Sequence, residues 1–203
     1  MLWGDKQVIR YLADRIASVF VLYGESSEDN ADIYAYAVEA LIAGLFNVII
    51  GLTISLLFGR VLEGIVFIIV FAFLRRYVGG YHANSHYKCI LIFCLLLTCS
   101  MLATSALSYV KPSVFVIIII AMLAWSGIFF LVSIEDKSMR CRDERRAKLK
   151  TKSLLANTFF LILCLIVGFT ISTCIASVIS LAMFSVFGCI VARLINKHMR
   201  RRV

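Results

Sequence analysis

Long apolar runs that are nearly free of charge, separated by short polar segments, are the dominant pattern along this chain. Three of them, residues 38–58, 89–109 and 113–134, are each long enough to form one helix across the roughly 30 Å hydrocarbon core of a bilayer. A fourth stretch begins at Leu154 and is about twice the length of one crossing. We therefore predict that it folds back as a hairpin, with a break near residues 172–173.

The run at residues 61–74 is shorter than the others and carries Glu63 near its start. As a helix it would extend for only about 21 Å, which is less than the thickness of the hydrocarbon core. Either this helix continues through Arg75 and Arg76, or the chain enters the following glycine-containing segment while it is still at membrane depth. Irregular backbone at that depth is stable only where protein or a water-filled cavity covers it.

The composition assigns these runs to a membrane rather than to a soluble core. Of the 203 residues, 62% are hydrophobic and only 16% are charged, and the mean hydropathy is +0.94. Soluble domains are about 45 to 50% apolar. The sequence therefore predicts an all-α fold, a polytopic membrane helical bundle of about six transmembrane or membrane-embedded helices in a single domain.

The first 30 residues have a different pattern, because apolar residues recur there at steps of three and four. This spacing is typical of an amphipathic helix that lies in the membrane interface or against the bundle. No apolar core of a cleavable signal peptide is evident in this segment. We expect the following order: an amphipathic helix (1–30), four spans (35–134), a basic loop (135–152), a hairpin (154–194) and a basic tail (195–203).

Positive charge is distributed very unevenly between the two ends of the predicted spans. If both termini, residues 75–88 and residues 135–152 share one side, only Arg60 and Lys111 of the 21 Lys and Arg residues fall on the other side. By the positive-inside rule, that basic side is cytoplasmic. The net charge of +9 thus reflects membrane topology, and a nucleic-acid partner is not expected because no stacking or groove-reading motif accompanies it.

Candidate chemistry is concentrated in the polar segment at residues 75–89, which holds both a histidine and a cysteine. His82 precedes Cys89 by seven positions, and Gly79 and Gly80 lie just before the histidine. An imidazole that removes the proton of a thiol leaves a reactive thiolate. This pair is therefore a candidate base and nucleophile.

The geometry of such a pair requires a break in the helix. On one straight helix, His82 and Cys89 would lie about 10.5 Å apart along the axis, too far for the imidazole to reach the sulfur. Glycines at 79–80 or the polar residues at 84–85 are plausible positions for the break. Pairing between the two copies of a homodimer would also solve the geometry.

Two other interpretations of this segment remain open at this stage. His82, His86 and Cys89 could ligate a zinc ion, because histidines at positions i and i+4 of a helix share one face. No fourth ligand lies in the neighbourhood, so we expect no metal. In the other interpretation the histidines are interfacial polar residues and the cysteine is a small core residue.

Arg75, the two glycines and the Tyr-His-Ala run, followed by Cys89, resemble the signature of the accessory gene regulator B family (AgrB). These are integral-membrane cysteine endopeptidases of quorum sensing in Gram-positive bacteria. The length, the N-terminal amphipathic segment and the basic loop are also similar to that family. The resemblance implies that Cys89 is the nucleophile and His82 its base, with Arg75, Gly79 and Gly80 as supporting positions and no cofactor.

The resemblance also implies a substrate, a short precursor peptide of the AgrD type. Cys89 would attack the peptide bond that precedes the charged C-terminal tail, release the tail and hold the central segment as a thioester. A cysteine or serine of the precursor would then close a thiolactone or lactone ring, giving an autoinducing peptide. A small membrane peptide transporter or binding protein without proteolytic activity is the alternative, although such proteins more often show repeats or polar residues near the midplane.

Basic side chains in the loop at 135–152 have two interpretations, of which topology determination explains most of the cluster. Alternatively, Arg145, Arg146 and Lys148 contact the acidic tail of the precursor or the headgroups of membrane lipids.

The remaining cysteines show no CxxC spacing and mostly lie inside apolar spans, so they are predicted to be small buried residues and not disulfides. They are Cys94, Cys99, Cys141, Cys164, Cys174 and Cys189.

Overall fold

The computed structural model describes residues 31–78, 86–110, 114–137 and 144–200. The predicted amphipathic helix at 1–30 lies outside the described residues. For several residues near the helix ends only the backbone is described: 31–37, 39–40, 78, 86–88, 110, 133–137, 144–149, 196–198 and 200. The chain divides into two compact units, Met1–Ile50 and Gly51–Val203, and each is considered by itself below.

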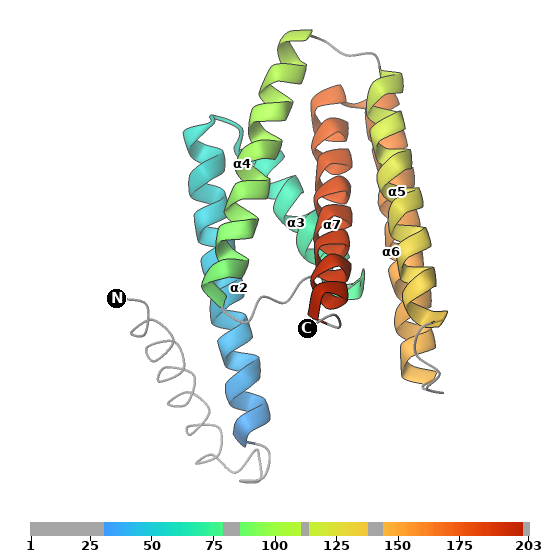
Figure 1. Ribbon diagram of the computed structural model, residues 1–203. Helices are drawn as coiled ribbons and strands as arrows, with labels where there is room; N and C mark the ends of the chain where they lie inside the picture. The colour runs from blue at the N-terminus through green and yellow to red at the C-terminus, as the bar shows by residue number, and fades with distance from the viewer. Residues whose placement is uncertain (1–30, 79–85, 111–113, 138–143, 201–203) are drawn as a thin grey trace. The chain divides into compact units, whose positions relative to one another are not determined.

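Every element in the described part of the chain is an α-helix, which confirms the predicted fold class (Figure 1). The helices are α2 (Ala31–Leu57), α3 (Val61–Val78), α4 (His86–Val110), α5 (Val114–Lys137), α6 (Glu144–Thr170) and α7 (Thr173–Arg200). Four segments within them are long and apolar enough to cross a membrane: Cys89–Tyr109, Val114–Val132, Lys150–Thr170 and Thr173–Ile195. A shorter apolar helical segment runs over Leu41–Leu57. These segments make the chain a polytopic membrane protein.

The first of the two options for the short run is the observed one, since α3 continues through Arg75 and Arg76 to Val78. Its 18 residues correspond to about 27 Å. Glu63 lies in the first turn and the two arginines lie in the last turn, the placements that the helix dipole favours. The helix dipole and the added turn thus explain how a run with charges at both ends forms a single helix.

A tight turn joins α2 to α3 at Gly59, which has a φ of 64°. The N–H of Arg60 donates to the carbonyl of Ser55 and that of Gly59 to the carbonyl of Leu56, both at 2.9 Å. This pair of bonds is a Schellman motif, and it requires the left-handed conformation that glycine adopts freely. The turn brings the end of α2 back against the start of α3.

The predicted break in the long apolar stretch is confirmed, because α6 ends at Thr170 and α7 begins at Thr173. The N–H of Ser172 donates to the carbonyl of Val167, and the carbonyl of Ser172 accepts from the N–H of Ala176. Ser172 therefore closes one helix and starts the next. Residues 144–152, expected in a loop, instead form the first turns of α6.

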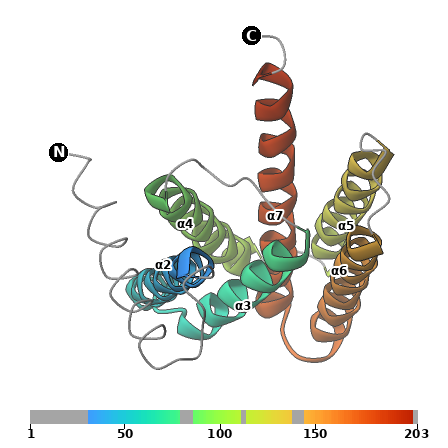
Figure 2. The same cartoon turned by 90° about the horizontal axis from the view of Figure 1, so that it is seen from below.

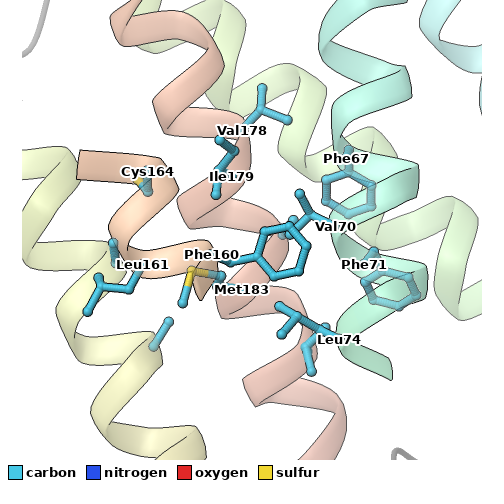
Figure 3. Packing of buried hydrophobic residues seen from close by; sticks show 14 of the residues in the cluster. Phe67, Val70, Phe71, Leu74, Phe160, Leu161, Cys164, Val178, Ile179 and Met183 are labelled. Atoms are coloured by element: carbon cyan, nitrogen blue, oxygen red, sulfur yellow. The ribbon is translucent and has the colours of Figure 1, made fainter. Parts of the chain in front are cut away.

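Within Gly51–Val203, α7 is the central helix and packs against α3, α4, α5 and α6. Seen from below, it lies between α3 and α4 on one side and α5 and α6 on the other (Figure 2). The ring of Phe160 of α6 lies beside the apolar face of α3 in the interior, and Met183 of α7 belongs to the same buried cluster (Figure 3). The α3 face consists of Phe67, Val70, Phe71 and Leu74, all of them buried. The core thus places α3 and α4 against the same helix.

Close approach of helices depends on small residues at two places. A Cβ atom added at Gly64 of α3 would overlap the side chain of Ser55, and one added at Gly127 of α5 would overlap the ring of Phe187. Ser55 is fully buried, and its hydroxyl donates to the carbonyl of Gly51 at 2.7 Å. Membrane helices commonly pack through such small residues, because lipid supplies no hydrophobic drive for helices to associate.

Arg60, one of the two basic residues expected on the less basic side, is paired. Its guanidinium contacts the carboxylate of Glu63 at 3.1 Å and donates to the hydroxyl of Ser108 in α4 at 3.0 Å. The ion pair neutralises Arg60, and the bond to Ser108 ties the start of α3 to the end of α4.

Candidate active site

Cys89 lies in the first turn of α4 and its side chain is half-buried. It is also the first residue of the apolar segment that is long enough to cross a membrane. The start of a helix presents unpaired N–H groups and the positive end of the helix dipole, an environment that favours negative charge. The thiol is therefore at the boundary between the span and the polar segment before it.

Arg75 contacts this thiol directly. Its Nη2 atom lies 3.2 Å from Sγ of Cys89 and donates a hydrogen bond to it, although 14 residues separate the two in the sequence. Arg75 comes from the last turn of α3, so the contact joins the end of one helix to the start of the next. From the sequence, Arg75 was expected only as a supporting position of the motif, and its contact with Cys89 was not predicted.

An aromatic cluster beneath this contact holds the two helices together. The guanidinium carbon of Arg75 lies 5.7 Å from the centre of the Phe71 ring, one turn earlier on α3. Phe71 in turn packs on Phe93, one turn after Cys89 on α4, with ring centroids 5.6 Å apart. Both phenylalanines are 3% exposed, so the platform below Arg75 and Cys89 is part of the core.

Cys189 of α7 lies close enough to Arg75 and Cys89 to interact electrostatically with both. Its side chain is buried, as the sequence analysis predicted. No sequence signal connects Cys189 with the motif, which lies 100 residues before it. Only the packing of α7 against α3 and α4 brings them together.

Three predicted site residues, His82, Gly79 and Gly80, lie outside the described residues. The separation of His82 from Cys89 therefore stays a prediction, as does the homodimer that would offer another way of pairing them. Of His86 the structure describes only the backbone, so the metal interpretation is not tested either.

The predicted tail-binding residues, Arg145, Arg146 and Lys148, lie in the first turns of α6, and only their backbone is described. Their helical placement puts them before the apolar part of α6, which begins at Lys150.

The other cysteines of the described chain form no disulfide. Cys164 is buried as predicted, whereas Cys94 and Cys174 are half-buried. The prediction of burial is wrong for Cys99, which is exposed on α4. A thiol is apolar enough to face lipid, so nothing requires it to point inward. Cys141 lies outside the described residues.

The sequence profile of the family described as accessory gene regulator B, AgrB, matches residues 10–187. The chain belongs to the AgrB family. The matched region contains both Arg75 and Cys89 and ends two residues before Cys189. The recognition made from the glycine, histidine and cysteine spacing is therefore confirmed.

Two curated relatives of Clostridium perfringens are similar to this AgrB chain over most of its length. "Putative AgrB-like protein 2" of strain 13 is 26% identical over 161 residues, which cover 77% of this chain and 73% of the relative. "Putative AgrB-like protein" of strain SM101 is 30% identical over 146 residues, or 67% of this chain and 68% of the relative. No solved structure matches the chain.

Proposed function

We propose that this AgrB-family chain is a membrane cysteine endopeptidase that removes the C-terminal tail of an AgrD-like precursor peptide. The observation that carries the proposal is Cys89, placed within the AgrB match at the start of a span with its sulfur bonded to a guanidinium. A half-buried thiol next to a cation is the kind of environment in which reactive cysteines occur.

The proposed reaction has two acyl transfers. His82 takes the proton of Cys89, and the thiolate attacks the carbonyl of the peptide bond before the tail. The amide nitrogen leaves with the proton from His82, which releases the tail and leaves a thioester on Cys89. The internal cysteine or serine of the precursor, deprotonated by His82, then attacks the thioester, closes the thiolactone or lactone ring and expels the Cys89 thiolate.

Water must be kept from the thioester, because its hydrolysis is strongly favourable whereas acyl transfer between two thiols is nearly balanced. The position of Cys89 at the edge of an apolar span suits this requirement. A tethered nucleophile that is held close then reacts before water does. Backbone N–H groups of Gly79 and Gly80 are proposed to stabilise the oxyanion in both steps.

A trapped intermediate tests the proposal. The full chain in membranes is mixed with an AgrD-like precursor whose ring-forming residue is changed to alanine, so that the second transfer is blocked. We expect intact mass analysis to show Cys89 carrying the acyl segment, and hydroxylamine to remove it. Tail release without any adduct on Cys89 would contradict the thioester mechanism.

Arg145, Arg146 and Lys148 are proposed to bind the acidic tail of the precursor, because basic clusters next to a span attract anionic groups. Changing both Arg145 and Arg146 to glutamine is expected to raise the precursor concentration needed for half-maximal cleavage about tenfold.

The matched control for that double variant is Arg201→Gln with Arg202→Gln, which removes the same charge from the basic tail. It is expected to cleave like the wild type. Reporter fusions at the C-terminus, which we propose to be cytoplasmic together with the N-terminus and the site, check that insertion is unchanged. Equal cleavage by both double variants would remove the tail-binding role.

A further inference from the structure

We propose that Arg75 is a catalytic cation that stabilises the Cys89 sulfur as a thiolate and stabilises the negative charge that develops in both acyl transfers. The stabilisation of the thiolate rests on the geometry alone. The role in the acyl transfers rests also on the proposed peptidase function. The bond of 3.2 Å from Nη2 to Sγ makes Arg75 a direct neighbour of the reacting atom.

The hydrogen bond from Arg75 is stronger when the Cys89 sulfur is a thiolate than when it is a thiol. A guanidinium stays protonated in proteins, so it donates to sulfur whether the sulfur is a thiol or a thiolate. Bonds between a cation and an anion are about twice as strong as neutral ones. The contact therefore favours the form of Cys89 that acts as a nucleophile.

The surroundings increase this effect. Cys89 begins an apolar span and is half-buried, so a negative charge placed on its sulfur would be less screened than it would be in water. A lone thiolate there would lose much of its hydration, whereas a thiolate paired with Arg75 forms a locally neutral pair. Arg75 thus removes the main obstacle to a charged nucleophile at the membrane edge.

The cation is also held in place. The Phe71 ring lies under the guanidinium at 5.7 Å, and Phe71 packs on Phe93, which follows Cys89 by one helical turn. The bond from Arg75 to Cys89 and the packing of Phe71 on Phe93 both join α3 to α4, and the contact of Arg75 with Phe71 connects these two links. Because the rings are buried, Arg75 is oriented before any substrate arrives, and little reorganisation is needed during the reaction.

Charge moves only a short way during the proposed reaction. It passes from the sulfur to the oxygen of the tetrahedral intermediate, which is separated from the sulfur by one carbon atom. In the second step the deprotonated ring-forming nucleophile brings a negative charge to the thioester, and this charge passes through a second oxyanion to the departing Cys89 sulfur. A fixed guanidinium next to Sγ is close to the negative charge in each of the two transfers, and it stabilises the leaving thiolate of the second step as well as the nucleophile of the first.

The chain offers a matched control in Arg76, the next residue on the same helix, whose side chain is exposed. Arg75→Gln and Arg76→Gln remove the same charge from the same turn of α3. The first measurement is the rate at which iodoacetamide alkylates Cys89 in the membrane-bound protein, followed by mass analysis of the Cys89 peptide. This readout needs no precursor, and it reports the thiolate because only the thiolate reacts.

We expect Arg75→Gln to slow alkylation of Cys89 by about tenfold or more, as for the loss of a hydrogen bond to a charged group. Arg76→Gln is expected to keep the wild-type rate. Guanidinium chloride at a non-denaturing concentration should restore alkylation to Arg75→Ala, and sodium chloride should not; such rescue also shows that the variant is folded. Wild-type alkylation in Arg75→Gln would overturn the proposal.

The rate of acyl-enzyme formation in a single turnover tests whether Arg75 acts in the acyl transfers. Arg75→Gln is expected to lower the maximal rate with little change in the precursor concentration that half-saturates it. The opposite split would make Arg75 a substrate-binding residue and overturn its catalytic role. A failure of the peptidase proposal is seen separately, as tail removal that survives Cys89→Ala, and the alkylation result then decides alone whether Arg75 stabilises the thiolate.

Discussion

Replacing Cys89 with alanine is expected to abolish removal of the precursor tail, with a loss of about 10⁴-fold or more in rate, as for other lost nucleophiles. The physical reason is that no other group in the described part of the chain combines a thiol, contact with a cation and a place at the start of a span. Intact mass analysis of precursor co-expressed with each variant gives the fraction cleaved. The substitution deletes only one sulfur atom from a half-buried position, so the fold should be kept.

Cys99→Ala is the matched control, because it removes a thiol from the same helix at an exposed position. Full cleavage is expected for it. His82→Ala is expected to lose about 10²- to 10⁴-fold, the usual contribution of a general base. Cleavage by Cys89→Ala at the wild-type level would eliminate the cysteine mechanism and return the transport alternative to consideration.

Gly64→Ala is expected to lower the free energy of unfolding by about 1 to 3 kcal/mol, the usual cost of overpacking. The added methyl group would occupy the position of the Ser55 side chain, which is fully buried and bonded to the carbonyl of Gly51. The backbone of α2 or α3 must therefore shift. Thermal unfolding of the purified protein in detergent measures the loss.

Gly188→Ala provides the comparison, because a Cβ atom there meets nothing within 4 Å. Alanine at that helical position should be neutral or stabilising, since glycine is the poorer helix former. Adding Ser55→Gly to Gly64→Ala removes the overlapping side chain and should recover part of the stability. If Gly64→Ala were as stable as the wild type, the close approach of these helices would not occur in the protein.

Hydropathy predicted the helices well, because the cost of placing charges in lipid fixes where a span begins and ends. The connection after Thr170 was predicted because the apolar stretch is about twice the length of one crossing, whereas the extension of α3 through Arg75 was one of two alternatives that the sequence left open. The spacing of the glycine, histidine and cysteine residues was sufficient to identify the family.

Which face of each helix points inward could not be predicted. Leu95 and Leu97 are the same residue type on α4, yet the first is 65% exposed and the second is fully buried. Lipid is as apolar as the protein interior, so both faces of a span tolerate leucine and no polar stripe marks the outside. For the same reason Cys99 was wrongly expected to be buried, and the neighbourhood of Cys189 had no sequence signal.

The central place of α7 has a consequence for biosynthesis. A ribosome delivers α3, α4, α5 and α6 to the membrane before α7, yet each of these four packs against it. Until α7 is inserted, the buried side chains of the earlier helices have lipid or one another as neighbours. The helix that packs against both α3 and α4, which carry Arg75 and Cys89, therefore arrives only after these two helices have been made. A chain whose synthesis stopped before α7 would be inserted in the membrane with this pair lacking part of its surroundings.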